Sequence, residues 1–408
     1  MVADDSTEAA GSQSALRRAN ERHVIDALRA LGPASQATLA RHVGLSRSAI
    51  NAIVRSLAHD GSVEVRPGVS GRETSVVLAG ARGALVAIDL GHQRLHGSVI
   101  SFDNETRDDE VVDLGREHEA HADVSTVAAL VDRLLERSGI EASAVHQVCV
   151  ALHAPYDTRS RTIAPGGILP GWEGLDVAAV LGERLGMPVA VDNDANYAAL
   201  AEFTWGAGRG ERDLLYVKSS NGIGSGLILD GAIFRGANGM AGELGHIVVD
   251  DRGAICNCGN RGCLSAVASG RALLLELATA GVPRASLQDV ITDARAGDLQ
   301  CRRLLGEAGR YIGLGLANAV KLIAPSTIVF GGELAAAGSL IFDSVWSELE
   351  ANTLPTPSGP PRLEQGIRRG DMAVLGCVAA VLSEQGVGFS ELPAWLLSPT
   401  GHRVKEYA

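Results

Sequence analysis

The sequence predicts an α/β protein: a small N-terminal module of helices with a short sheet, followed by a larger body of alternating strands and helices. Three observations carry this prediction. Apolar residues keep a helical spacing up to about residue 57, whereas strand-like and helical runs alternate from residue 84 onward. Segments 84–101 and 213–234 both read as strand, glycine turn and strand, which indicates a duplicated α/β unit. Positive charge gathers between residues 15 and 73 of a chain whose net charge is −12.

The composition is that of an ordinary globular protein. With 408 residues and 46% hydrophobic content, the chain can form two or three domains with sizeable cores. Its longest apolar run near the end, 372–382, is too short to cross a bilayer, and acidic residues stand where a signal peptide would be basic. We therefore expect a cytoplasmic protein with no membrane partner. Residues 1–14 are small and polar, and are expected to form a disordered tail.

Residues 15–80 predict a winged helix-turn-helix domain. A first helix stops at Gly32-Pro33, and Ser35 is the expected N-cap of a second helix that ends at Gly44. Ser46 is the expected N-cap of a third helix. The following stretch, SVEVRPGVSGRETSVVLA, reads as strand, loop and strand, which is the pattern of a wing.

The third helix of this domain has a polar, cationic outer face. In a winged helix-turn-helix this helix enters the major groove, where arginine pairs with guanine and asparagine with adenine. The residues expected to contact double-stranded operator DNA are Arg47, Ser48, Asn51 and Arg55 on the helix, and Arg66 and Arg72 in the wing. A single module makes few phosphate contacts, so we expect a homodimer or homotetramer that reads two half-sites. The alternative is a three-helix adaptor with a solvated basic face.

Three cysteines and a histidine gather between residues 246 and 263. His246, Cys256, Cys258 and Cys263 offer three thiolates and one imidazole, a closed tetrahedral set typical of structural Zn²⁺. A catalytic zinc would keep one position open for water. The glycines of CNCGNRGC let the backbone fold around a metal, and the CxC spacing disfavours a thioredoxin-like redox pair. The alternative is a set of buried thiols beside a hydrogen-bonded histidine.

Five motifs carry a family resemblance. In chain order they are ILPGW (168–172), VDNDANYAALAE (191–202), GIGSG (222–226), RGANGMAGELGH (235–246) and CNCGNRGCL (256–264). Their order is similar to that of the ROK family of sugar kinases and repressors. With the DNA-binding module in front, the chain resembles a ROK transcriptional regulator over nearly all of residues 16–385.

The resemblance implies a two-lobed, actin-like and ribonuclease-H-like ATPase fold with a sugar cleft between the lobes. The implied division is 81–200 plus 372–390 for the first lobe, 201–371 for the second lobe with the zinc site, and 391–408 for a C-terminal tail. The last helix, about 373–385, is expected to pack back on the first lobe.

The resemblance also implies which residues bind the sugar. They are Asn193, Asp194, Glu243 and His246, and Asp194 matches the family's kinase base. The alternative for Asp194 is a helix cap. Ile168 stands where the family commonly has asparagine, and Ser265 stands where it has glutamate, so two sugar contacts are missing. A free sugar, an amino sugar, a phosphosugar and an oligosaccharide all remain open.

The phosphate-binding hairpins depart from the kinase pattern. The family's Asp-x-Gly-Gly-Thr reads Asp89-Leu90-Gly91-His92-Gln93, and the second hairpin has Asn221 in place of threonine. ATP is therefore not expected as a cofactor, and no catalytic residue is assigned. The sequence predicts a sugar-responsive repressor that binds a carbohydrate effector without phosphorylating it. The alternatives are a ROK sugar kinase with an added DNA-binding domain and a DNA-binding scaffold without a ligand.

Overall fold

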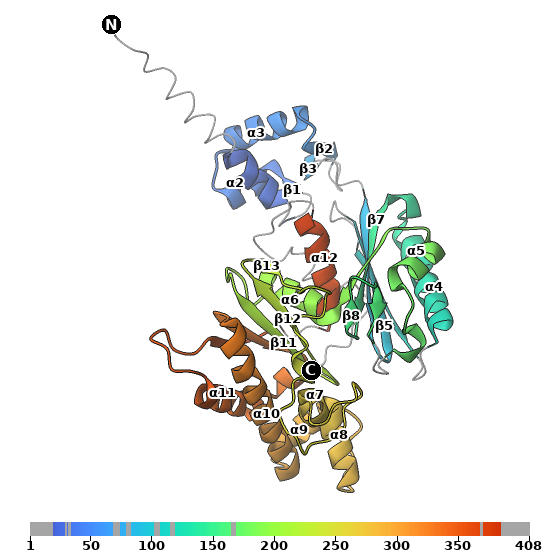
Figure 1. Ribbon diagram of the computed structural model, residues 1–408. Helices are drawn as coiled ribbons and strands as arrows, with labels where there is room; N and C mark the ends of the chain where they lie inside the picture. Colours follow the sequence, from blue (N-terminus) through green and yellow to red (C-terminus); the bar gives the residue numbers. More distant parts are fainter. Residues whose placement is uncertain are drawn as a thin grey trace.

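The computed structural model describes residues 19–28, 31, 34–67, 74–78, 83–101, 107–114, 119–164, 169–367 and 370–384. The chain forms a small N-terminal module above a larger body that contains two sheets (Figure 1). The predicted tails 1–14 and 391–408, as well as Arg72 and Ile168, lie outside the described residues. Among the helices that are described, none is long and apolar enough to span a membrane.

The N-terminal module has the predicted helices and wing. Residues 19–28 are helical, and α2 (Gln36–Val43) and α3 (Arg47–His59) follow. The Ser35 and Ser46 hydroxyls accept hydrogen bonds from backbone N–H groups in the first turns of α2 and α3, which confirms both predicted caps. Gly44 ends α2 with a φ of 72°, as predicted. The three antiparallel strands lie in the order β1 (Ala34–Ser35), β3 (Thr74–Leu78) and β2 (Val63–Pro67).

The first sheet of the body has five strands. In spatial order they are β10 (Val189–Asn193), β7 (Val145–Leu152), β4 (Ala84–Leu90), β5 (Arg94–Ser101) and β6 (Arg107–Asp113). Strands β10, β7 and β4 are parallel, whereas β5 and β6 pair antiparallel. Helices α4 (Ala120–Ser138) and α5 (Val177–Leu185) pack on one face, where the apolar side chains of β4 and β7 join theirs in a common core. A short hairpin, β8 (Tyr156–Asp157) and β9 (Thr162–Ile163), follows β7.

The second sheet repeats the arrangement of the first. Its strands lie in the order β13 (Ala232–Ile233), β12 (Ile223–Leu229), β11 (Leu214–Ser219), β14 (Thr327–Gly331) and β15 (Arg362–Gln365). Strand β11 pairs antiparallel with β12 and parallel with β14, just as β4 pairs with β5 and β7. The predicted duplication is thus confirmed. Its helices are α7 (Leu264–Ala268), α8 (Gly270–Thr279), α9 (Leu287–Ala296), α10 (Leu299–Ile323) and α11 (Ser339–Asn352).

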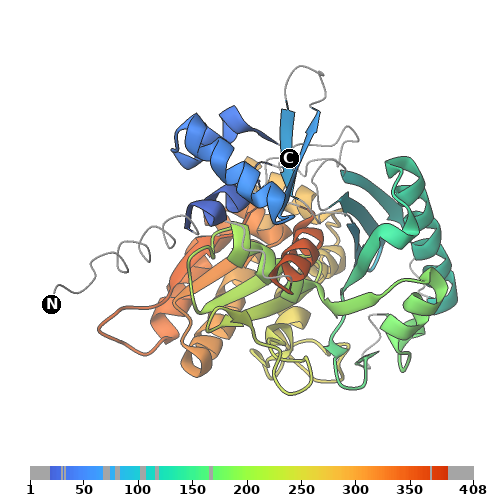
Figure 2. The ribbon, with the colours of Figure 1, turned by 90° about the horizontal axis from the view of Figure 1, so that it is seen from above.

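Two helices lie between the sheets. Helix α6 (Asp194–Trp205) follows β10, and α12 (Met372–Glu384) returns from the second sheet to cross it (Figure 2). A β-carbon on Gly376 would lie 1.8 Å from the Tyr197 carbonyl oxygen. The two helices pack so closely at this point that only glycine fits. One core joins both helices to β4, β7, β11 and β14. The last helix therefore packs against the first sheet, as the resemblance implies.

Candidate functional site

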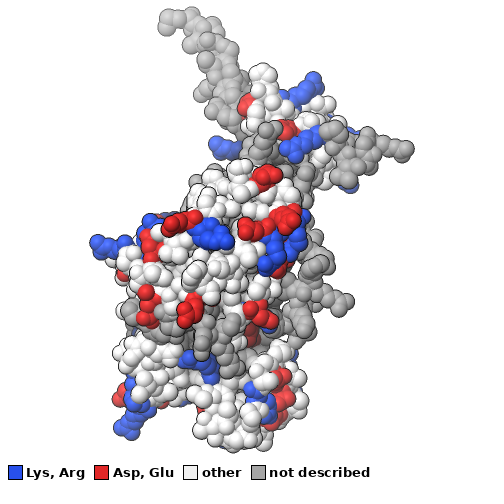
Figure 3. All heavy atoms as spheres, turned by 90° about the vertical axis from the view of Figure 1, so that its right-hand side faces the viewer, with Lys and Arg blue, Asp and Glu red and all other residues white. Residues whose placement is uncertain are grey.

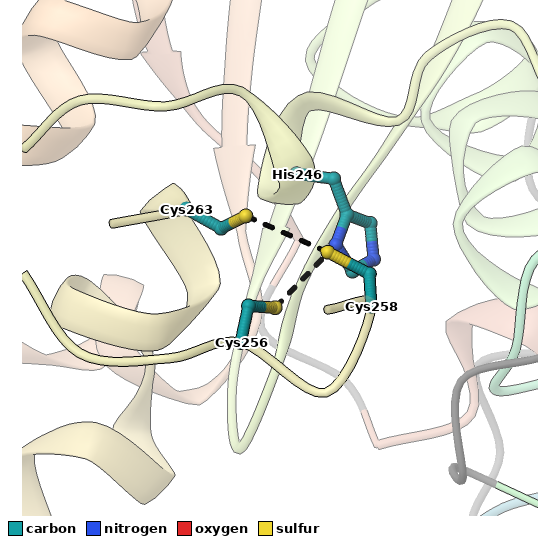
Figure 4. A group of neighbouring side chains, drawn as sticks. All are labelled: His246, Cys256, Cys258 and Cys263. Atoms are coloured by element: carbon teal, nitrogen blue, oxygen red, sulfur yellow. Dashed lines mark hydrogen bonds between the residues drawn. The ribbon is translucent and has the colours of Figure 1, made fainter. Parts of the chain in front are cut away.

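The four predicted metal ligands come together in one cluster. His246 ends the short 3-10 helix η3 (Leu244–His246), Cys256 and Cys258 lie in the loop that follows, and Cys263 precedes α7. All four ligand atoms lie within 4.8 Å of one another (Figure 4). Cys258 Sγ and Cys263 Sγ are 3.6 Å apart, and Cys256 Sγ is 3.6 Å from His246 Nδ1. Zn–S bonds of about 2.3 Å in a tetrahedron place neighbouring sulfurs about 3.8 Å apart, so the spacing fits zinc.

The loop that carries the cysteines is folded tightly on itself. The backbone N–H of Cys256 donates to the Asn260 carbonyl at 2.8 Å, and the N–H of Gly262 donates to the Ala254 carbonyl at 2.8 Å. Gly262 has a φ of 70°, and a β-carbon there would lie 1.4 Å from the Asp250 carbonyl oxygen. Only glycine fits this position. The local backbone therefore directs the three thiols to one point.

His246 connects this cluster to the predicted sugar contact Glu243. Its Nδ1 faces Cys256, while its Nε2 lies 3.9 Å from Glu243 Oε2. Burial, together with the negative charge of Asp194, raises the pKa of Glu243 to about 7. A β-carbon on Gly245 would lie 2.1 Å from the Ile223 carbonyl oxygen, so this segment lies directly on β12. The metal cluster and the second hairpin together fix where Glu243 stands.

Asn193 and Asp194 stand at the junction of β10 and α6. Asn193 is the helix cap: its Oδ1 accepts from the Ala195 N–H at 2.9 Å, and its Nδ2 donates to the Ala154 carbonyl at 3.0 Å. Asp194 is the first residue of the helix, so the alternative that Asp194 is itself the cap is wrong. Both the oxygen and the nitrogen of the Asn193 side-chain amide already form hydrogen bonds with backbone groups. A hydrogen bond from Asn193 to a sugar remains a prediction.

The carboxylate of Asp194 belongs to a cluster of four ionisable groups. Lys218 Nζ donates a hydrogen bond to Asp194 Oδ2, and His153 Nε2 lies 3.3 Å from the same oxygen. His153 Nε2 is also 2.7 Å from Asp89 Oδ1 and 3.4 Å from Lys218 Nζ. The four residues come from the end of β4, the turn after β7, the start of α6 and the end of β11. Sequence reasoning did not assign Lys218 or His153 to a site.

Electrostatics favours the charged forms of Asp89, His153 and Lys218. Burial opposes ionisation of Asp89, but the charge and hydrogen bond of His153, aided by Lys218, lower the pKa of Asp89 to about 2. Burial likewise opposes the charged forms of His153 and Lys218, yet Asp194 and Asp89 raise the pKa of both. Asp194 and Asp89 are therefore carboxylates that already have cationic partners.

Ser265, which replaces the family's glutamate, has a backbone role. Its hydroxyl accepts from the Ile223 N–H at 3.3 Å and donates to the Ile223 carbonyl at 3.2 Å. This pair of bonds ties the residue after Leu264 to the start of β12. Ser265 stands where the family has a sugar-contacting glutamate. In this chain its side chain instead joins α7 to the second hairpin.

The predicted DNA-contacting residues share one exposed face of α3. Arg47, Ser48, Asn51 and Arg55 are exposed, whereas the apolar residues of the helix are buried. Arg55 Nε donates to Asn51 Oδ1 at 3.0 Å, so these two side chains are presented together. In the wing, Arg66 forms an ion pair with Glu64 at 3.1 Å. Arginine side chains project from this module above a body of mixed charge (Figure 3).

Two mixed sheets that repeat one another, with a helix pair between them, define an actin-like α/β body, here preceded by a winged helix-turn-helix module. The metal cluster and the junction of β10 and α6 are the features expected of a particular family with this fold. The chain belongs to the ROK family, whose model matches residues 85–384.

Known relatives include both regulators and kinases. The chain is 27% identical over 354 residues to the xylose repressor of Bacillus subtilis (strain 168). This match covers 83% of this chain and 88% of that protein. Its fold is similar to that of a ROK family transcriptional regulator homologous to the E. coli MLC protein, with a TM-score of 0.67, 22% identity and coverage of 90% of this chain and 96% of the other. A Streptomyces griseus ROK glucokinase, solved with glucose and AMPPNP, has a TM-score of 0.63 and 27% identity, and covers 74% of this chain and 100% of its own.

Proposed function

We propose that this chain is a sugar-responsive transcriptional repressor whose two-lobed body binds a carbohydrate effector without phosphorylating it. One observation carries the proposal. Residues 85–408 make up about four fifths of the chain, so the likeness to the ROK transcriptional regulator structure, which covers 90% of the chain, includes about half of the first 84 residues. Those residues contain the winged helix-turn-helix, whereas the glucokinase structure covers 74% of the chain. The similarity to regulators therefore includes the part that a kinase does not need.

The carbohydrate site is proposed at Asp194, Glu243 and His246, with Asn193 beside them. Carboxylates accept hydrogen bonds from sugar hydroxyls, and such charged acceptors form the stronger bonds. Burial, together with the charge of Asp194, raises the pKa of the Glu243 carboxyl. D-Xylose is the first sugar to test, because it is named in the repressor relative whose match covers 83% of this chain.

Phosphoryl transfer is the second candidate function, because Asp194 retains the carboxylate that a sugar kinase needs. The sequences of the two phosphate-binding hairpins argue against phosphoryl transfer. His92 and Gln93 replace the glycine and threonine of the first hairpin, and Asn221 replaces the threonine of the second. Nucleotide phosphates need close backbone approach and hydroxyl donors, which these substitutions remove.

Zinc is the proposed occupant of the cluster of His246, Cys256, Cys258 and Cys263. Four protein ligands fill a tetrahedral shell, so the ion would have no open position for water and its role would be structural. A homodimer or homotetramer is the proposed assembly, since two winged modules are needed to read two half-sites of an operator.

The proposal is tested by joining a sugar screen to a DNA titration. Sugars that bind are found by thermal shift, beginning with D-xylose and D-glucose, and an operator is selected from random duplexes with the intact protein. A bound sugar is expected to weaken operator binding by roughly 5–150-fold, the usual range of allosteric coupling. Sugar-dependent ATP consumption at about 1 per second or faster would instead favour the kinase.

Replacing Arg47 with alanine is expected to weaken binding to the selected operator by about 1 to 3 kcal/mol, and to weaken binding to random DNA far less. Arg47 is exposed at the start of α3, where a side chain reaches base edges. The measurement is a titration of both duplexes at one fixed salt concentration. Arg209→Ala removes the same charge from an exposed position in the body and serves as the matched control. Equal losses on both duplexes would assign Arg47 to phosphate contact.

A further inference from the structure

The cluster around Asp194 joins the two sheets of the body. Lys218 lies on β11 of the second sheet, whereas Asp89 and His153 stand at the ends of β4 and β7 in the first sheet. The side chains of Lys218, Asp194 and Asp89 are 22%, 9% and 15% exposed. The ion pair between Lys218 and Asp194 is therefore a largely buried contact at the junction of the two halves of the body.

Asp89 and Asp194 both lie within 3.3 Å of one nitrogen, His153 Nε2, so these two carboxylates share one site. Like charges that share a site repel, and the repulsion is relieved by protonation or by a positive partner. Carboxylates at a junction of strand ends are ordinary ligands for Mg²⁺ or Mn²⁺, which would bring nucleotide phosphates with them. Here the positive partners belong to the chain. Lys218 Nζ contacts Asp194, and His153 Nε2 bridges from Asp194 to Asp89.

We propose that Lys218 is a built-in cation of the body: together with His153 it neutralises Asp194 and Asp89, the pair of carboxylates to which a divalent metal would otherwise bind. The Lys218 ammonium pairs with Asp194 and so ties the second sheet to the first without a bound ion, while His153 pairs with Asp89. A divalent metal would have to displace this ammonium and also approach His153, whose pKa is raised by the same carboxylates. Lys218 therefore disfavours binding of a nucleotide that carries a divalent metal. This inference does not depend on DNA or sugar binding.

The test is metal binding by the intact, zinc-loaded protein. Mn²⁺ replaces Mg²⁺ as the probe because free Mn²⁺ has a strong electron paramagnetic resonance signal that is lost on binding. The wild-type protein and Lys218→Arg, which keeps the charge, are expected to bind Mn²⁺ no more tightly than about 1 mM. Lys218→Met removes the charge but keeps most of the volume. It is expected to bind one Mn²⁺ at least about 10-fold more tightly, because a repelling charge at contact distance is gone.

A second substitution assigns the gained site. Asp89→Asn added to Lys218→Met is expected to return Mn²⁺ binding to the wild-type level, since one of the two carboxylate ligands is lost. Lys218→Gln, which can still donate to Asp194, replaces Lys218→Met if the latter does not fold. The proposal is overturned if the folded uncharged variants bind Mn²⁺ no better than the wild type. It is equally overturned if the wild type itself has a tight Mn²⁺ site that Asp89→Asn removes.

Discussion

Replacing Cys258 with serine is expected to release the zinc and to lower the melting temperature of the second half of the body. Cys258 Sγ lies 3.6 Å from Cys263 Sγ, and its loss leaves three ligands for a four-coordinate ion. Loss of an outer partner of a zinc ligand already costs roughly 10–100-fold in metal affinity, so loss of a ligand itself should exceed that. Because metal binding free energy adds to folding free energy, stability falls with the metal. Elemental analysis and a melting curve measure the two effects.

Cys301→Ser is the matched control for this prediction. Cys301 is buried at the start of α10, far along the chain from the cluster, so its replacement costs packing but leaves all four ligands in place. One zinc per chain should remain in that variant. Cys258→Ser should also weaken sugar binding, because His246 Nε2 lies beside Glu243 and both move with the loop. A structural role for zinc is contradicted if wild-type protein without zinc melts at the same temperature as wild-type protein that contains zinc.

The features predicted well from sequence are those that local chemistry decides. The caps Ser35 and Ser46, the stop at Gly44 and the two repeated hairpins each depend on a few neighbouring residues. The metal cluster is also local, because its four ligands lie within eighteen residues and the glycines between them allow the tight loop. The alternative that Asp194 caps α6 misses the observed cap, Asn193, by one residue.

The ion cluster was missed because it depends on tertiary packing. His153 is 64 residues from Asp89 and 65 from Lys218 in the chain, so no spacing rule joins them. A signal was nevertheless present. Lys218 is the last residue but one of LLYVKS, directly after four apolar residues, and a lysine there must find a partner when the strand is buried. Asp89, at the end of ALVAIDL, carries the same signal on the matching strand of the other half.

Asp194→Asn is expected to abolish most of the sugar response while leaving operator affinity without sugar nearly unchanged. The substitution keeps the shape of the side chain and one acceptor oxygen for Lys218, but removes the charge that strengthens hydrogen bonds to sugar hydroxyls. Asp194 lies in the body, at the start of α6, whereas the predicted DNA contacts lie in the N-terminal module, so the substitution does not alter them directly. The sugar concentration that half-releases the operator should rise by about 10-fold or more, as expected for loss of a hydrogen bond to a charged group.

This result follows only if the sugar acts by favouring one state of the body over another. A ligand with equal affinity for both states shifts nothing, however tightly it binds. Closure of the two halves on a sugar held by Asp194 and Glu243 would alter the spacing of two winged modules in a dimer, whose half-sites lie about 34 Å apart or at multiples of that distance. The experiment is an operator titration, with and without the sugar found by thermal shift, on wild type, Asp194→Asn and the exposed-site control Asp343→Asn. The control should behave as wild type. The mechanism is refuted if the operator affinity of the wild-type protein is unchanged by every sugar that is shown to bind it.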